Sequence, residues 1–139
     1  MSKYSTLLTE RTGPVLKITT NRPEVLNAQS RILLEELDDA FLRAVDDNEV
    51  RVIILAGAGK HFSAGHDLGS PQEMADQKKN PVEGFKEEYR RLSERFFENT
   101  MRWRDIPKPT IAQVQGYCIM GGMMIASACD ITPMPTMRS

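Results

Sequence analysis

Two short apolar runs, at residues 50–55 and 110–114, constrain the fold of this chain most strongly. Each is nearly continuous in apolar or β-branched side chains, a pattern typical of strands that are buried on both faces. Gly57 follows the first run and Gly116 follows the second, so the backbone can turn sharply where each strand ends. We therefore expect a layered α/β fold whose sheet has parallel elements.

The segments around these runs predict a hairpin and three helices. Residues 4–10 and 14–20 mix β-branched and polar side chains around a Gly-Pro pair, which indicates a β-hairpin. Apolar residues at spacings of three and four predict helices over 30–47 and 82–103. A third helix is predicted over 121–129, where it begins at a glycine. The stripe expected to be buried in the second helix is Phe85, Tyr89, Leu92, Phe96 and Trp103.

Composition limits the classes of partner and compartment. The 139 residues suggest one domain, and a net charge of −1 argues against a nucleic-acid backbone as partner. Arginines over residues 90–104 alternate with acids, which favours a solvated helix face. There is no apolar signal segment or membrane-length apolar run, and two cysteines make no pairing pattern. We predict a cytoplasmic protein, with a polar and potentially mobile segment at 70–81.

Three familiar motifs fail on inspection. Gly59-Lys60 resembles the end of a phosphate-binding loop, but Ile54 stands where its first glycine should be and His61 where a Ser or Thr should follow. The dinucleotide fingerprint fails because no glycine follows at the required spacing. Ser63 lacks the flanking glycine pattern of a hydrolase nucleophile elbow. These failures exclude nucleotide-triphosphate, dinucleotide and lipase-like hypotheses.

Two glycine-containing segments, 61–68 and 116–124, carry the informative chemistry. Each comes directly after a predicted buried strand. In the second, a helix is predicted to begin at Gly121, and the first N–H groups of a helix have no partner within it and carry partial positive charge. Such N–H groups are natural donors to a developing oxyanion.

Three segments together resemble the crotonase superfamily, the enoyl-CoA hydratase/isomerase family. They are Arg22-Pro23-Glu24-Val25-Leu26-Asn27-Ala28, the 62–68 stretch, and Lys108-Pro109-Thr110-Ile111-Ala112 leading into Gly116-Tyr117. Their order and spacing match the family over residues 4–130. The resemblance implies the crotonase-like spiral ββα fold of the ClpP/crotonase type, incomplete at the C-terminus, and a substrate that is an acyl-CoA thioester.

The resemblance also implies a set of site residues. The backbone N–H groups of His66 and Gly121 would hold the thioester oxygen, and coenzyme A would lie along the loop 22–27 and the backbone near Ala64. Arg22 is either a contact for a CoA phosphate or a solvated surface arginine. The expected substrate-binding residues are Arg22, Asn27, Ala64, Gly65, Asp67, Met120 and Met124.

The acid/base residues of the family are the point of departure. In hydratases a glutamate lies three residues after the oxyanion glycine, where this chain has Met124, and the second glutamate is expected beyond Ser139. His66 could serve as a base, although its side chain often points away from the carbonyl in such members. Asp67 is expected to brace its loop, and Cys118 to be a core residue rather than a nucleophile. Met120, Met123 and Met124 are expected to line an acyl pocket or the core rather than a metal or redox site.

The chain end leads to three competing functions. We expect residues 1–130 to be the N-terminal portion of an acyl-CoA-binding domain and 131–139 an atypical tail containing Pro133 and Pro135, as in a truncated product. The candidates are a hydratase or isomerase, a non-catalytic CoA-thioester binder or assembly partner of longer relatives, and a product without stable function. No metal is expected, and no cofactor beyond the coenzyme A of the substrate; relatives form trimers or hexamers.

Overall fold

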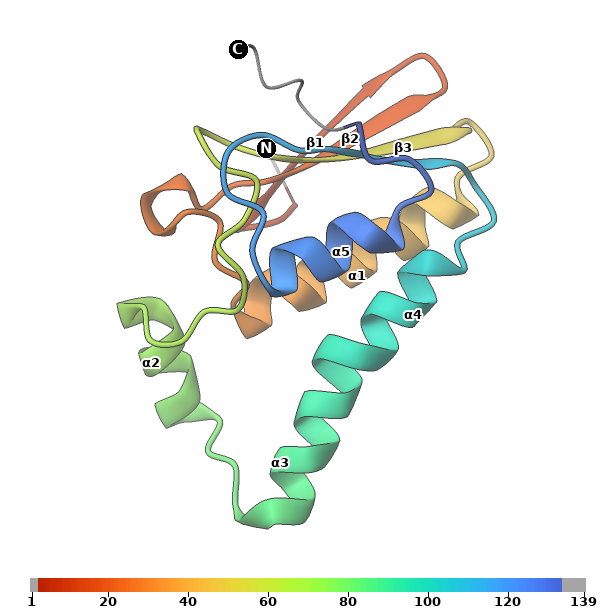
Figure 1. Cartoon of the computed structure of the whole chain (residues 1–139). Helices are drawn as coiled ribbons and strands as arrows, with labels where there is room; N and C mark the ends of the chain where they lie inside the picture. Colours follow the sequence, from red (N-terminus) through yellow and green to blue (C-terminus); the bar gives the residue numbers. More distant parts are fainter. Residues whose placement is uncertain (1–2, 134–139) are drawn as a thin grey trace.

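A mixed four-stranded sheet organises the computed structural model, which describes residues 3–133 (Figure 1). Its strands are β1 (Leu7–Thr12), β2 (Val15–Thr20), β3 (Val52–Gly57) and β4 (Thr110–Gln113), in that spatial order. The β1–β2 pair is antiparallel, whereas β2–β3 and β3–β4 are parallel. The α/β class and the predicted hairpin are confirmed. Strand β3 begins and ends two residues later than the apolar run at 50–55 had indicated.

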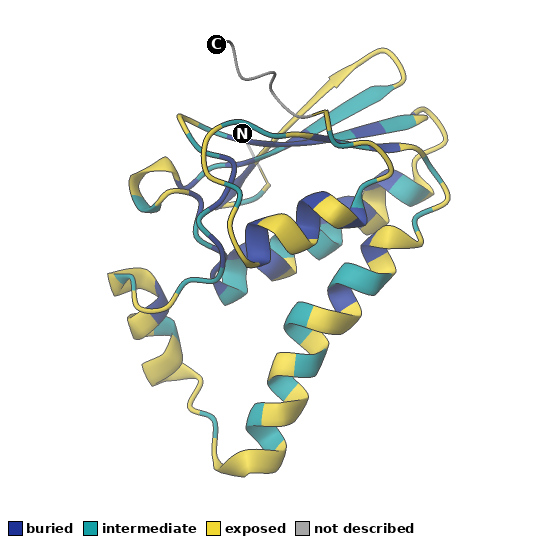
Figure 2. Ribbon diagram, viewed as in Figure 1, coloured by how far each residue is buried: buried dark blue, intermediate teal, exposed yellow. Residues whose placement is uncertain are grey.

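The first long helix, α1 (Arg31–Asp46), covers one face of this sheet together with α5 (Gly121–Ala128) (Figures 1 and 2). Ser30 caps α1, because its hydroxyl accepts a hydrogen bond of 3.2 Å from the Leu33 N–H. The predicted apolar stripe is confirmed by the residues that α1 buries: Leu33, Leu34, Leu37, Ala40, Phe41 and Ala44. They form one core with Ile18, Ile53 and Leu55 of the sheet.

Residues 70–81, which the sequence analysis expected as a polar segment without assigning a helix, are mostly helical. They form α2 (Pro71–Lys79), which begins with proline at its first position. The Ser70 hydroxyl accepts a hydrogen bond of 3.2 Å from the N–H of Glu73, and Glu73 itself is buried. A serine followed three residues later by glutamate is a helix-start signal that outweighs the polarity of the segment.

The helix predicted over 82–103 is three consecutive helical segments: α3 (Gly84–Leu92), the π-helical η2 (Ser93–Glu98) and α4 (Asn99–Arg104). The stripe expected to be buried is wrong for α3, since Phe85 is 85% exposed and Tyr89 is 65% exposed. The physical reason is visible in Figures 1 and 2: α3 extends away from the sheet, and no second layer lies against it.

The three segments α3, η2 and α4 together form a helical arm. Its C-terminal end, α4, is fixed to the core. Trp103 is buried, lies 5.5 Å from the Phe41 ring and donates a hydrogen bond of 2.8 Å from its indole N–H to Asp38. Arg102 forms an ion pair of 2.9 Å with the same Asp38. The last turn of the arm is therefore clamped to α1, while its first turns are not.

The chain leaves α5 and returns to the sheet. Ile131 bridges Ile111 of β4 in parallel, with a 2.8 Å hydrogen bond from the Ala112 N–H to the Ile131 carbonyl. The first residue of the predicted tail thus extends the sheet by one pairing, and Pro135 lies outside the described residues. Over residues 3–133, no helix is both long enough and apolar enough to cross a membrane.

Candidate active site

The two glycine-containing segments lie side by side beyond the ends of β3 and β4. Ser63 and Cys118 form a parallel bridge, in which the Ser63 N–H donates to the Tyr117 carbonyl over 2.9 Å. The Ile119 N–H donates back to the Ser63 carbonyl over 3.1 Å. These bonds continue the parallel pairing of the strands, and they bring the stretch before His66 against the beginning of α5.

Glycine is required on both sides of this contact. Gly65 has φ +99°, and a β-carbon there would lie 2.9 Å from the Ile119 carbonyl oxygen and 3.4 Å from the Gly121 nitrogen. A β-carbon on Gly121 would lie 2.7 Å from Nε2 of His66 and 2.6 Å from Oε1 of Gln29. The residues that the sequence singled out as oxyanion donors, His66 and Gly121, are therefore neighbours in space.

The backbone N–H groups of His66 and Gly121 make no hydrogen bond to any residue from 3 to 133. Their neighbours do: the Gly65 N–H donates to the Ser63 hydroxyl over 3.1 Å, and the Asp67 N–H to the Gln29 carbonyl over 3.0 Å. At the helix the Gly122 N–H donates to the Ile119 carbonyl over 2.8 Å. The His66 and Gly121 amides thus remain unpaired donors on adjacent segments.

The His66 side chain turns toward the helical arm. Its ring lies 3.9 Å, centroid to centroid, from the ring of Phe96 in η2, and it is half-buried. This burial lowers the pKa of His66 below its ordinary value of 6.5. Burial thus favours the neutral imidazole, whose ring is tilted by 38° against that of Phe96. Sequence reasoning missed Phe96 as a site neighbour, because its place depends on how the arm folds back.

Asn27, one of the predicted substrate-binding residues, has both ends of its amide occupied within the fold. Its Oδ1 accepts a 2.9 Å hydrogen bond from the Arg22 N–H, and its Nδ2 donates to the carbonyls of Ala58 and His61 over 2.9 and 2.8 Å. Its φ of 53° is left-handed, a conformation that asparagine tolerates. The Ala64 N–H, likewise, donates to the Leu26 carbonyl over 2.9 Å. Both residues hold the 22–27 loop against the site.

Arg22 and Asp67 form a buried ion pair. The Arg22 Nη1 lies 2.9 Å from Oδ2 of Asp67, and each side chain is only 3% exposed. Nη1 also donates to the Ala28 carbonyl over 2.5 Å, and Nη2 to the Ser70 hydroxyl over 3.2 Å. The solvated-arginine alternative is therefore wrong. To reach a phosphate of coenzyme A, this guanidinium would first have to leave Asp67.

Asp67 ties the loop after His66 to the start of α2. Burial raises the pKa of Asp67, but the hydrogen bonds from Ser70 and Arg22 outweigh it, so the pKa lies below its ordinary value. Oδ1 accepts from the Ser70 N–H over 2.8 Å and Oδ2 from its hydroxyl over 2.6 Å. The carboxylate is thus ionised and fully engaged, and it braces this loop.

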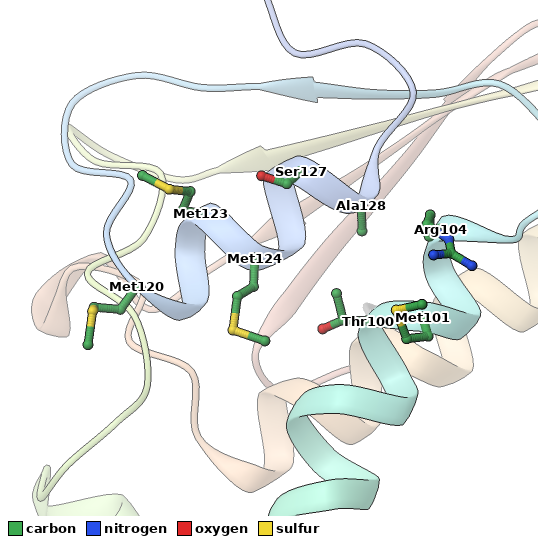
Figure 3. A pocket seen from close by; sticks show the side chains of 8 residues that line it. All are labelled: Thr100, Met101, Arg104, Met120, Met123, Met124, Ser127 and Ala128. Carbon is green, nitrogen blue, oxygen red and sulfur yellow. The ribbon is translucent and has the colours of Figure 1, made fainter.

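A cavity of about 360 Å³ opens between α4 and α5 (Figure 3). Its lining is Thr100, Met101, Arg104, Met120, Met123, Met124, Ser127 and Ala128. Met120 is 75% exposed and Met124 is 36% exposed, so their flexible thioether chains are accessible to a ligand. This lining contains no carboxylate. Cys118 lies outside it, and burial raises the pKa of its thiol, which disfavours the thiolate that a nucleophile requires.

Comparison with known proteins places this arrangement in a family. The model of the enoyl-CoA hydratase/isomerase family matches residues 10–136. The short-chain-enoyl-CoA hydratase of Clostridium acetobutylicum is 38% identical over 93% of this chain and 46% of its own length. The mitochondrial Δ(3,5)-Δ(2,4)-dienoyl-CoA isomerase of Rattus norvegicus is 36% identical over 84% of this chain and 36% of its own.

A solved structure agrees with these matches. The crystal structure of a probable enoyl-CoA hydratase from Mycobacterium smegmatis superimposes with a TM-score of 0.80 at 42% identity, covering 92% of this chain and 48% of that one. The chain has the α/β fold of this solved structure over the part that superimposes. It belongs to the enoyl-CoA hydratase/isomerase family, the crotonase superfamily. It spans under half the length of the relatives named here.

Proposed function

We propose that this chain binds an acyl-CoA thioester and polarises its carbonyl between the N–H groups of His66 and Gly121. One observation carries the proposal: these two amides are unpaired among residues 3–133, and they lie on neighbouring backbone segments where the glycines allow close approach. Donors fixed by a rigid backbone need no reorganisation as negative charge develops on the oxygen, and each can be worth roughly 3 kcal/mol in a transition state.

The acyl chain would occupy the methionine-lined cavity between α4 and α5. Met120 immediately precedes Gly121 and Met124 lies one turn further along α5, so the cavity begins beside the proposed donors. Methionine side chains are flexible and polarisable, and they adapt to acyl chains of different shape. The surrounding apolar lining favours an unsubstituted hydrocarbon chain over a charged one.

Hydration requires a group that moves a proton, and the described residues offer none at this place. General acid/base groups typically contribute about 10²–10⁴-fold. Met124 stands at the position that the family resemblance gives to a glutamate, and a thioether transfers no proton. The neutral imidazole of His66 stacks on Phe96 instead of facing the methionine cavity. The proposal is therefore thioester binding and polarisation, without appreciable hydration by this chain alone.

A second candidate is assembly with longer family members, and the exposed apolar side chains of the arm favour it. Phe85, Tyr89 and Phe97 are 85%, 65% and 60% exposed along one helical arm. Large exposed apolar patches mark surfaces that associate with other chains. Size-exclusion chromatography with and without a longer relative tests this candidate, which predicts a stable complex, whereas independent elution would reject it.

The test of thioester binding is a pair of calorimetric titrations. Butyryl-CoA carries the carbonyl, and S-butyl-CoA is a thioether of the same chain length that lacks it. A carbonyl held by two amides predicts tighter binding of butyryl-CoA, by about 25-fold for two net hydrogen bonds. Equal affinity for the two ligands would remove the basis of the proposal, and so would the absence of any binding.

A further inference from the structure

A second cavity, of about 300 Å³, lies on the other side of His66. It is enclosed by the start of α1, the loop after His66, α2 and the α3–η2 arm. Three arginines contribute to its lining: Arg31, Arg91 and Arg95. The cavity is distinct from the methionine-lined one, since the two have no lining residue in common.

Arg31 is already paired on all sides. Its Nε and Nη2 lie 2.6 and 2.5 Å from the two oxygens of Asp76, and its Nη1 lies 2.7 Å from Glu35. This bidentate pairing holds the guanidinium rigidly at the N-terminal end of α1. Arg31 therefore lies in the cavity lining as a fixed guanidinium, with three of its five N–H donors already used.

Arg91 is only partly satisfied. Its Nη2 donates to Glu88 over 2.7 Å, but its Nε is buried and has no hydrogen-bond partner among the described residues. A buried donor without a partner costs free energy, and in native proteins it commonly marks a site where another group binds. Arg91 thus lies in the cavity lining with one of its N–H donors buried and unpaired.

Arg95 has no partner at all within residues 3–133: it makes neither a hydrogen bond nor an ion pair there. It is half-buried in the lining of the cavity. Burial and the positive charge of Arg91 lower the pKa of Arg95, with Arg31 adding to the repulsion, while Glu35 and Glu73 oppose it. The fold alone leaves this guanidinium short of negative charge.

Each acid in the cavity lining already has a partner, and none of them pairs with Arg95. Asp67 pairs with Arg22, and Glu88 pairs with Arg91. Glu73 accepts from the Arg31 N–H through Oε2 and from the Gln77 amide through Oε1, both over 3.2 Å. Among the described residues, Arg95 is therefore the arginine of this lining that is left without an acidic partner.

The backbone that presents Arg95 is itself unusual. Arg95 and Phe96 lie in the π-helical segment η2, and Phe96 carries the ring that stacks on His66. Such π-helical turns are rare and are frequent at functional sites. Here the turn places a guanidinium and an aromatic ring on the same side, toward the loop after His66.

We infer that this cavity binds a small oxyanion, a carboxylate or a phosphate group, between the guanidinium groups of Arg91 and Arg95. Planar guanidinium forks match the paired oxygens of both groups. The inference goes beyond thioester binding and does not depend on it, because the methionine cavity and the free amides of His66 and Gly121 are not involved. Its experiments accordingly use free anions without coenzyme A.

The experiment measures the thermal unfolding of the whole chain in low-salt, anion-poor buffer, with succinate and inorganic phosphate titrated separately. Chloride at matched ionic strength is the control for screening. Either anion should raise the midpoint of unfolding in a saturable way that chloride does not reproduce. The anion with the lower apparent dissociation constant identifies the group, carboxylate or phosphate, that the site prefers.

Three chains are compared: the unaltered one, Arg95→Gln, and Arg90→Gln as the matched control. Arg90 lies on the same arm but outside this cavity, in exposed pairs with Glu87 and Glu94. In Arg95→Gln the apparent dissociation constant should rise about tenfold, since one charge-assisted contact is lost. Arg90→Gln should keep the anion response.

The direction in which Arg95→Gln shifts the unfolding midpoint separates a binding role of Arg95 from a merely structural one. Without added anion, Arg95→Gln should unfold about 2 °C higher than the unaltered chain, because the repulsion from Arg91 and Arg31 is removed. A structural arginine would instead lower the midpoint when removed. The inference is overturned if Arg95→Gln destabilises the anion-free chain, if it keeps the full anion response, or if neither anion outperforms chloride.

Discussion

The imidazole of His66 leaves no space for a side chain at Gly121. A β-carbon on Gly121 would lie 2.7 Å from Nε2 and 2.8 Å from Cδ2 of that ring, distances that real β-carbons do not adopt. The ring is in turn held by Phe96, at 3.9 Å between centroids. The start of α5, the His66 side chain and the helical arm are therefore packed in series, and the position of the Gly121 amide depends on both neighbours.

Gly121→Ala should displace His66 and misplace the amide. We expect the overpacking to lower the free energy of unfolding by about 1–3 kcal/mol. We also expect weaker binding of butyryl-CoA, by roughly fivefold for one lost hydrogen bond. Gly69→Ala is the matched control, since a β-carbon at Gly69 meets no atom within 4 Å. Urea unfolding and calorimetry measure both effects. A Gly121→Ala chain as stable as Gly69→Ala would refute this packing.

Arg22→Ala should destabilise the chain strongly. It would leave the buried Asp67 carboxylate without its counter-ion, and breaking a buried pair from one side costs about 3–5 kcal/mol. Arg43→Ala provides the comparison, because its pair with Asp39 is largely exposed, at 62% and 44%, and exposed pairs contribute about 0–1 kcal/mol. Denaturant unfolding curves give both values. If the two variants lose similar stability, Arg22 is not the buried brace described above.

The stability of the chain should fall as the pH drops below neutrality, in part because of His66. Burial lowers the pKa of this imidazole in the folded chain, so the unfolded chain takes up the proton first as the pH falls through 6.5. Stability is then lost until the pH reaches the lower, folded value. Arg91 and Arg95 line the same cavity as His66.

The check is urea unfolding of the unaltered chain and of His66→Gln at pH 7.5 and 5.5, in buffers without phosphate or carboxylate. The loss of stability between the two pH values should be smaller in His66→Gln. An equal loss in both chains would place the titrating group elsewhere.

Local signals predicted most of the fold. The apolar runs became β3 and β4 and the α1 stripe became core, because strands and helices that face a sheet carry their burial in their own periodicity. The same periodicity misled for α3, whose Phe85 and Tyr89 are exposed. A helix stripe says which side is apolar, but it does not say whether anything lies against it.

Those parts of the candidate site that are formed by the backbone could be predicted from the sequence. The parts that depend on which side chains pair with each other could not. Gly65 and Gly121 lie in the two glycine-containing segments that the sequence singled out, and a β-carbon at either residue would lie within 3 Å of another atom. The burial of Arg22 was not foreseeable, since its partner Asp67 lies 45 residues away along the chain. The start of α2 could have been found, because Ser70 and Glu73 have the spacing of a helix-capping pair.

Met124→Glu should not create a hydratase. It would add one carboxylate to a cavity whose lining has none, while hydration in this family uses two. We expect no turnover of crotonyl-CoA above background for the unaltered chain, for Met124→Glu or for His66→Ala. A continuous hydration assay on purified protein measures this. Turnover in the unaltered chain that disappears in His66→Ala would instead identify the imidazole as the base.

The most direct measurement is of the two amides themselves. In a ¹⁵N-labelled chain, the N–H signals of His66 and Gly121 can be followed while butyryl-CoA or the carbonyl-free S-butyl-CoA is added. If the thioester oxygen lies between them, both amide protons shift downfield with butyryl-CoA and remain nearly unchanged with S-butyl-CoA, although both ligands bind. Equal shifts with the two ligands, or no shift of either amide while butyryl-CoA binds, would contradict the account.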